Sequence, residues 1–201
     1  MHTPSRRRFL IGGLGLATLV ATAACTAPGQ GQPSTGTTKS ASGADAVLAA
    51  LGLAGADARK VIDTLDALPV AERPADVMAS VRPEQLILKG ADGAEATIAM
   101  PGEFYVSFAP YLAKTHDCFF HSLTTCRGEL ANAPIHVTVT ADDGRVLVDE
   151  DRTTFDNGFS GLWLPRDIRA KLAVTHDGHA YEAQIGTGKD DPTCLTTVKL
   201  A

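Results

Sequence analysis

Between residues 44 and 83 the hydrophobic residues recur at the period of an amphipathic helix. The clearest segment follows Asp57, which stands where a helix N-cap is needed, and Pro69 ends it. We assign no chemistry to this predicted helix. Its apolar positions are Ala58, Val61, Ile62, Leu65 and Leu68, and the polar positions expected on its other side are Arg59, Lys60, Asp63 and Asp66.

Shorter helices are predicted on either side of that segment. One contains Val47 and Leu48. The other begins at Pro74, because proline suits the first turn of a helix, and would place Val77 and Val81 on one face with Met78. Together these segments predict a helical N-terminal region over residues 44–83.

From residue 84 onward the pattern changes to short stretches in which apolar and polar residues alternate, which is the period of a β-strand. Turn sequences rich in Gly, Asp and Asn separate these stretches, and the last predicted strand covers residues 196–200. Seven or so short strands without intervening helices predict an antiparallel β-sandwich over residues 84–201. The predicted fold class is therefore α+β, a short N-terminal helical region followed by an antiparallel β-sandwich-like domain.

Residues 1–25 have the pattern of an export signal, with three arginines before an apolar run that is shorter than the roughly 20 residues of a membrane span. The start resembles a twin-arginine signal. Cys25 ends a lipobox-like sequence in which Thr22 departs from the usual aliphatic residue, so ordinary cleavage after Ala24 is the alternative. Residues 26–43 read as a flexible linker. We expect an exported protein, either anchored by lipid on Cys25 to the outer face of the cell membrane or periplasmic.

The charge of the chain argues against one class of partner. Lys and Arg number 18 against 23 Asp and Glu, a net charge of −5, which becomes more negative without the arginines of the leader. An acidic chain repels the phosphates of nucleic acid, and no basic cluster follows the leader. Nucleic acid is therefore excluded as a predicted partner.

Residues 115–126 read THDCFFHSLTTC and hold two thiols and two imidazoles. Sulfur and imidazole together are the ligands of soft or borderline metals, and this set suits Cu(I) best and Zn(II) next. His121 is three residues from Cys118, and His116 is two residues from it, so one regular geometry cannot serve both pairs. We rank His121 above His116 as a ligand.

If Cys25 carries lipid, three cysteines remain, namely Cys118, Cys126 and Cys194. A purely structural role in an exported protein would favour an even number, because disulfides use cysteines in pairs. A disulfide from Cys118 to Cys126 or to Cys194 is the structural alternative, and the short loop to Cys126 would contribute about 2–3 kcal/mol. A thiol–disulfide oxidoreductase using Cys118 and Cys126 is a second alternative, although their eight-residue separation differs from C-x-x-C. A disulfide-stapled binding module without metal is the third.

The longest motif, THDCFFHSLTTCRGEL at residues 115–130, resembles the CueP family of exported bacterial copper-binding proteins. FYVS at residues 104–107 and TCLT at residues 193–196 extend the similarity, which covers about residue 44 to the end. The resemblance implies a helical N-terminal region before a β-rich domain, and a role in copper tolerance. By the match of motifs, Cys118, Cys126 and Cys194 correspond to the family's metal-associated cysteines, and His121 is an additional ligand.

We therefore predict an extracytoplasmic copper-binding protein that sequesters Cu(I) for copper tolerance or for delivery to a cuproenzyme. The predicted ligands are Cys118, His121, Cys126 and Cys194, and we assign no catalytic residue and no organic cofactor. Reduction of Cu(II) by the thiols is an additional activity that the chemistry allows, and zinc is the less favoured metal. The oligomeric state is left open, with a dimer as one option.

Overall fold

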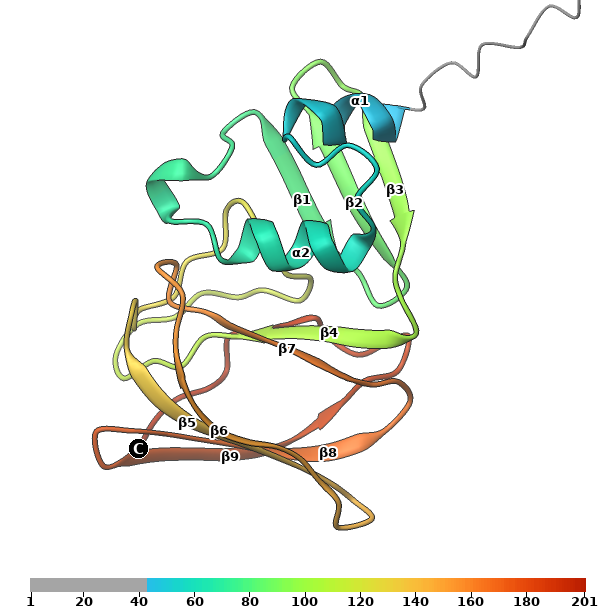
Figure 1. Cartoon of the computed structure of the whole chain (residues 1–201). Helices are drawn as coiled ribbons and strands as arrows, with labels where there is room; N and C mark the ends of the chain where they lie inside the picture. Colours follow the sequence, from blue (N-terminus) through green and yellow to red (C-terminus); the bar gives the residue numbers. More distant parts are fainter. Residues whose placement is uncertain (1–42) are drawn as a thin grey trace, which may run out of the picture. The chain divides into compact units, whose positions relative to one another are not determined.

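The computed structural model describes residues 43–201, so the predicted leader, Cys25 and the linker up to residue 42 lie outside the described residues (Figure 1). In the described part of the chain no helix is long and apolar enough to cross a membrane. The elements in chain order are α1 (Gly43–Ala50), α2 (Ala58–Asp66), the short 3-10 helix η1 (Val70–Glu72), β1 (Val77–Val81), β2 (Gln85–Gly90), β3 (Glu95–Ala99), β4 (Glu103–Phe108), β5 (Pro134–Ala141), β6 (Val146–Thr153), β7 (Ser160–Pro165), β8 (Arg169–His176), β9 (His179–Gly186) and β10 (Cys194–Leu195).

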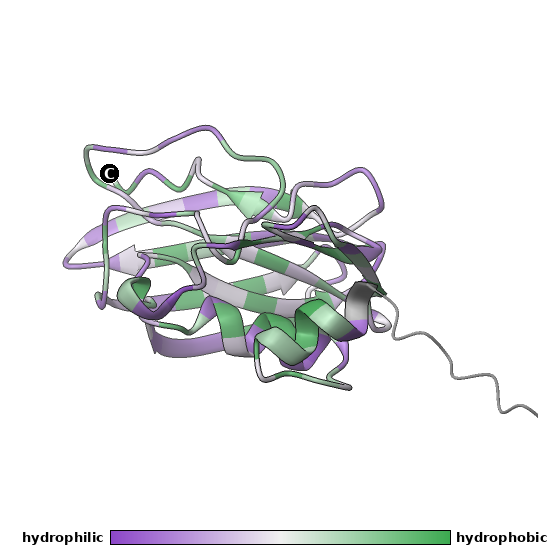
Figure 2. Ribbon diagram, turned by 90° about the horizontal axis from the view of Figure 1, so that it is seen from above, coloured by the Kyte–Doolittle hydropathy of each residue, from purple (hydrophilic) through white to green (hydrophobic). Residues whose placement is uncertain are grey.

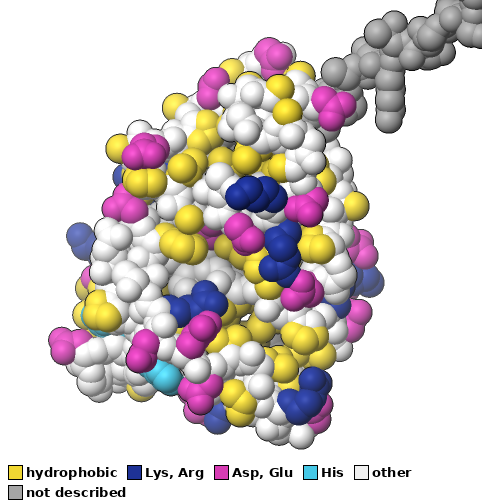
Figure 3. All heavy atoms as spheres, viewed as in Figure 1, with side chains coloured by type: hydrophobic (Ala, Val, Ile, Leu, Met, Phe, Trp, Pro, Cys, Tyr) yellow, Lys and Arg dark blue, Asp and Glu magenta, His cyan; other side chains and the backbone are white. Residues whose placement is uncertain are grey.

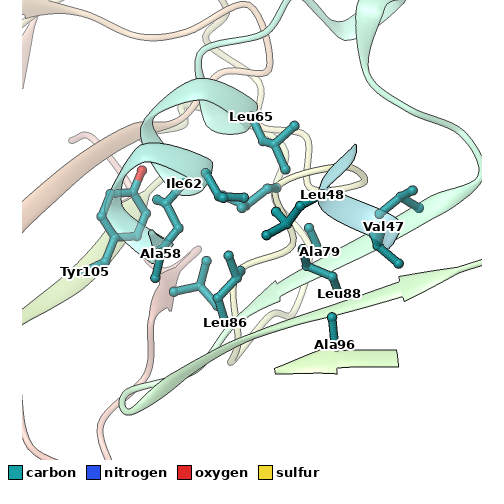
Figure 4. Packing of buried hydrophobic residues seen from close by; sticks show 14 residues of the cluster. Val47, Leu48, Ala58, Ile62, Leu65, Ala79, Leu86, Leu88, Ala96 and Tyr105 are labelled. Carbon is teal, nitrogen blue, oxygen red and sulfur yellow. The ribbon is translucent and has the colours of Figure 1, made fainter. Parts of the chain in front are cut away.

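The first sheet is an antiparallel meander in the order β1-β2-β3, and α1 and α2 cover it (Figure 1). Asp57 caps α2 as predicted, because its side chain accepts a hydrogen bond from the backbone N–H of Lys60 at 2.8 Å. The apolar side of α2 packs into a buried cluster with residues of α1 and of the first sheet. Tyr105 of β4 also belongs to this cluster (Figure 4). α2 is therefore held between the first sheet and β4.

The remaining strands form a sandwich of two sheets, ordered β10-β4-β7 and β6-β5-β8-β9. The sheet β10-β4-β7 contributes to two buried clusters, and β4 shows how. Phe104 and Phe108 point into the sandwich, whereas Tyr105 and Ser107 point toward α2. The change between hydrophobic and hydrophilic residues along the strands is visible in Figure 2. The predicted α+β fold with an antiparallel β-sandwich-like domain is confirmed.

The structure differs from the sequence predictions at three places. The segment after Pro74 is not a helix, because Val77–Val81 forms strand β1, in which buried and more exposed residues alternate and which pairs with β2. The predicted last strand at residues 196–200 is wrong: the last strand is Cys194–Leu195, and beyond it only an isolated bridge joins Lys199 to Tyr111. Strand β7 was not predicted. For β1 the pairing with the next strand, β2, decides the structure, and β7 and β10 each pair with the distant strand β4.

Charged side chains of both signs are mixed on the surface. Figure 3 shows Lys and Arg interspersed with Asp and Glu on the face seen there, without an extended basic patch. Several charged side chains of the described residues pair with a neighbour, such as Lys89 with Glu95 at 2.9 Å and Lys171 with Glu182 at 3.1 Å. Exposed pairs of this kind contribute little to stability, so they are not the feature that organises this protein.

Candidate metal centre

The four predicted ligands lie together in the folded chain. The sulfurs of Cys118 and Cys126 are 3.6 Å apart, and the sulfur of Cys194 lies 3.7 Å from Nδ1 of His121. One donor atom each from His121, Cys126 and Cys194 falls within 4.8 Å of the others. Two sulfurs on one tetrahedral ion at about 2.3 Å would be roughly 3.8 Å apart, so the sulfur spacing fits a shared metal. The three cysteines form no disulfide.

The segment that carries the motif is fixed against β1. It has neither helix nor strand over most of its length, yet its backbone is hydrogen bonded to the edge of β1. The N–H of Val81 donates to the carbonyl of His121 at 2.8 Å, and the N–H of Leu123 donates to the carbonyl of Ala79 at 2.9 Å. Because the segment is irregular, both His116 and His121 can face a cysteine, which a regular helix or strand would not permit.

Cys194 arrives at this segment from the far end of the chain. β10 pairs in parallel with β4, with Cys194 opposite Ser107. The N–H groups of Thr193 and Cys194 both donate to the carbonyl of Phe119, at 3.0 and 3.1 Å, and the N–H of His121 donates to Oγ1 of Thr193 at 3.0 Å. These bonds fix Cys194 beside His121, so the cluster exists only in the folded protein.

Two glycines bring the chain after Cys126 close to the start of β7. A Cβ on Gly158, where φ is +78°, would stand 2.7 Å from the carbonyl of Gly128, so no other residue fits without movement. The N–H of Gly128 donates to the carbonyl of Asn157 at 2.6 Å. This approach places Phe159 and the amide of Asn157 beside the cysteine and histidine cluster.

A buried carboxylate, that of Asp66 at the end of α2, lies behind His121. Asp66 is fully buried, and its Oδ1 is 3.0 Å from Nε2 of His121. Four further side chains surround the same carboxylate. They are Tyr105, whose hydroxyl donates at 2.6 Å, Ser107 at 3.1 Å, the amide of Asn157 at 3.2 Å, and the guanidinium of Arg73 at 3.5 Å.

These contacts set the charge state behind the cluster. Burial alone would raise the pKa of Asp66, but His121, Tyr105 and Arg73 together hold it below its usual value. Burial alone would lower the pKa of His121, but the Asp66 carboxylate outweighs it and raises the pKa to about 9. With the Nε2–H of His121 donating to Asp66, Nδ1 is the nitrogen that faces Cys194. A ligating histidine is commonly held in this way by a carboxylate.

The three thiols are not equivalent. Hydrogen bonds from Cys194 and His121 favour the thiolate of Cys126 and lower its pKa to about 3, and the N–H of Ser122 lies 3.3 Å from the same sulfur. Burial raises the pKa of Cys118 to about 11. Bonding to Cys126, with burial, raises the pKa of Cys194. Of the three thiols, Cys126 is therefore the one whose surroundings most favour the thiolate, which is the form that binds soft metals.

His116 also reaches a pair of thiols. One of its ring nitrogens lies within 4.8 Å of the sulfurs of Cys118 and Cys126, whereas His121 belongs to the set with Cys126 and Cys194. The two histidines differ in their surroundings, because His121 is buried and His116 is partly exposed.

The sequence alone did not identify Asp66 as a residue of the site, because its predicted position is on the polar side of its helix. The spacing contains the contrary signal, because Asp66 follows Ile62 by four residues and Ala58 by eight, which places it on the apolar face. A charged residue on that face is expected to have buried partners. Those partners come from β4, from the segment before β7 and from Arg73, and no local pattern connects them.

A surface hollow of about 670 Å³ lies at one end of the sheet β6-β5-β8-β9, and no cysteine lines it. His136, His176 and His179 line part of it. His136 is held instead by Asp151 at 2.8 Å and Asp149 at 3.0 Å. The soft-metal ligands of the described residues are therefore concentrated at the cluster around Cys126.

The family model described as "Periplasmic copper-binding protein CueP" matches residues 60–199. A solved structure described as "Crystal Structure of S.CueP" is 39% identical in sequence, with a TM-score of 0.74, and the match covers 78% of this chain and 96% of that one. A search of the curated proteins gave no significant match.

Proposed function

Because the chain belongs to the CueP family of periplasmic copper-binding proteins, we propose that it holds its copper as Cu(I) through Cys118, His121, Cys126 and Cys194. The single observation that supports this best is the sulfur of Cys126 placed between two further thiols and an imidazole. Thiolate and imidazole ligands select Cu(I) over harder cations. Zinc, which shares these ligands, is the less favoured metal.

The surroundings of the cluster support capture of copper in a reduced state. Cys126 and Cys194 are buried with Phe159 and Ala109 around them. A buried site favours a soft, singly charged ion held by few ligands over a hydrated divalent ion. Asp66 and Arg73 supply the charge balance behind His121.

Reduction of Cu(II) is a second part of the proposal. Two Cu(II) ions would each accept one electron, one from the sulfur of Cys118 and one from that of Cys126, and the two sulfurs would then form one disulfide with release of the Cys118 proton. A thiol reductant must then restore the two cysteines before they can hold Cu(I). The 3.6 Å between these sulfurs is short enough to close to the roughly 2.05 Å of a disulfide with small side-chain movements. The thiolate of Cys126 is the form that reacts.

Release to an acceptor, which we propose is a cuproenzyme, would proceed by ligand exchange. With His121 as the exchangeable fourth ligand, a three-coordinate Cu(I) site can pass its ion to incoming thiols without unfolding. We propose that the protein acts outside the cytoplasm, and that lipid on Cys25 would keep it at the membrane. The alternatives, an oxidoreductase or a stapled module without metal, are not favoured by membership in a copper-binding family.

The test is a titration of the reduced full-length protein with Cu(I) in competition with bicinchoninate, a chromophoric Cu(I) chelator. About one tightly bound Cu(I) per chain is expected, and none would contradict the proposal. For the reduction step, Cu(II) is added to wild type and to Cys118→Ser, and the Cu(I) chelate is followed by absorbance. Equal rates for the two proteins would contradict a role for Cys118 as electron donor.

A further inference from the structure

We infer that Cys126 is shared by two overlapping copper sites, an accessible outer triad of His116, Cys118 and Cys126 and a buried inner triad of His121, Cys126 and Cys194. Copper would pass between them without leaving Cys126. The inference rests on the proposed function, because it takes Cu(I) as the cargo. It assigns a role to His116, for which a single four-ligand site leaves none.

The two triads overlap at one sulfur, that of Cys126, and differ in their other two donor atoms. In each triad the three donor atoms lie within 4.8 Å of one another. Among the described residues each such set contains a single histidine, so one ion in this geometry cannot bind both imidazoles. Phe159 is fully buried and its ring contacts both, with centroids 6.2 Å from His116 and 4.8 Å from His121.

The triads differ in access to solvent. His121, Cys126 and Cys194 expose 0%, 6% and 2% of their surfaces. His116 is partly exposed and Cys118 is half-buried. An ion that arrives from solution therefore meets the outer triad first, and an ion in the inner triad leaves past it.

The outer triad is preorganised even though it is accessible. The backbone before His116 is held by the carboxylate of Glu129, because Oε2 accepts from the N–H groups of Leu112, Ala113 and Lys114, each at 2.9 Å. Thr115 is then tied to the chain after Cys194, since its hydroxyl donates to the carbonyl of Thr196 at 2.6 Å. An accessible histidine on a segment fixed this firmly is placed to bind a ligand.

Transfer between the triads is a ligand exchange with no change in oxidation state. The bonds from copper to His116 and Cys118 break, those to His121 and Cys194 form, and the bond to Cys126 persists. The thiol proton that Cys194 gives up is matched by the one that the released Cys118 thiolate takes up, and His121 gives its Nδ1 proton to solvent. The step needs no electron donor.

The test compares equilibrium and rate in the reduced full-length protein. Cu(I) affinity is measured by competition with bicinchoninate, and the rates of loading and of removal by excess bathocuproine disulfonate are followed by stopped-flow absorbance. His116→Asn is expected to keep its affinity within about threefold of wild type while both rates fall by about tenfold or more. His121→Asn is expected to lose affinity by about tenfold or more and to hold copper through the outer triad.

His179→Asn is the matched control, because His179 is exposed on β9 and belongs to neither triad. Unchanged rates in His116→Asn would overturn the two-triad proposal, and so would a loss of affinity equal to that of His121→Asn, which would indicate one site. X-ray absorption on copper-loaded His121→Asn gives a second check. Sulfur with imidazole ligation supports the outer triad, and sulfur without imidazole contradicts it. Failure of wild type to bind Cu(I) at all would instead remove the proposed function, and this inference with it.

Discussion

Replacement of Asp66 by asparagine is the substitution that most sharply tests how the cluster is built. Asn has almost the same shape as Asp, so Asp66→Asn removes the negative charge without opening a cavity. The buried guanidinium of Arg73, 3.5 Å from Oδ1, then loses its nearest carboxylate, although Cys126 and Asp156 still favour its charge. His121 loses the carboxylate that fixes its tautomer and raises its pKa.

The magnitude follows from these two losses. Removing one partner of a buried ion pair costs about 3–5 kcal/mol, so a clear fall in the free energy of unfolding of the metal-free protein is expected. Removing the carboxylate behind a ligating histidine costs about 10–100-fold in metal affinity. Those factors correspond to about 1.4–2.7 kcal/mol of binding free energy.

The assay is urea unfolding of the metal-free protein together with competition titration of Cu(I). The control is Asp63→Asn, one turn earlier on α2, because Asp63 is exposed and bonds only the indole N–H of Trp163 at 2.8 Å among the hydrogen bonds seen for its side chain. Asp63→Asn should change neither quantity greatly. Wild-type Cu(I) affinity in folded Asp66→Asn would refute the idea that Asp66 orients His121.

Cys126→Ser should lower Cu(I) affinity more than Cys118→Ser, because Cys126 belongs to both triads, and competition titration of the two variants measures this. The pKa of His121 is raised from 6.5 to about 9 on folding. Its contribution to the stability of the metal-free protein is therefore complete below pH 6.5 and is lost as the pH rises through 9. Urea unfolding across that pH range measures this loss. The pKa of Asp66 is lowered, so its contribution should fall at acid pH, below its ordinary value, in the same series. Tyr105→Phe removes the hydroxyl that donates to Asp66 at 2.6 Å and should cost about 1–3 kcal/mol in unfolding free energy.

The parts of the fold that depend on local pattern were predictable. The N-cap at Asp57 and the apolar face of α2 follow from residue spacing within a few positions. β1 was not predictable in the same way. Val77, Ala79 and Val81 alternate as in a strand, but the short segment after Pro74 also fits a helix, and pairing with β2 decides between them.

For the site, too, the residue types could be predicted from the sequence, whereas the contacts made by tertiary packing could not. The residue types of Cys118, His121, Cys126 and Cys194 were sufficient to name them as ligand candidates, and the fold brings them within a few ångströms of one another. Asp66 could not be placed behind His121, since the contact spans 55 positions and depends on how α2 packs against β4. A buried polar network is specified by tertiary packing and has no repeat in the sequence.

The most direct test of the central claim is Cu K-edge X-ray absorption on the reduced full-length protein loaded with one equivalent of Cu(I). The account predicts a low-coordinate Cu(I) ion bound by at least two sulfur atoms and one imidazole nitrogen, with the sulfur contribution reduced in Cys126→Ser. Copper bound by nitrogen and oxygen alone, or a wild-type spectrum from Cys126→Ser, would contradict it.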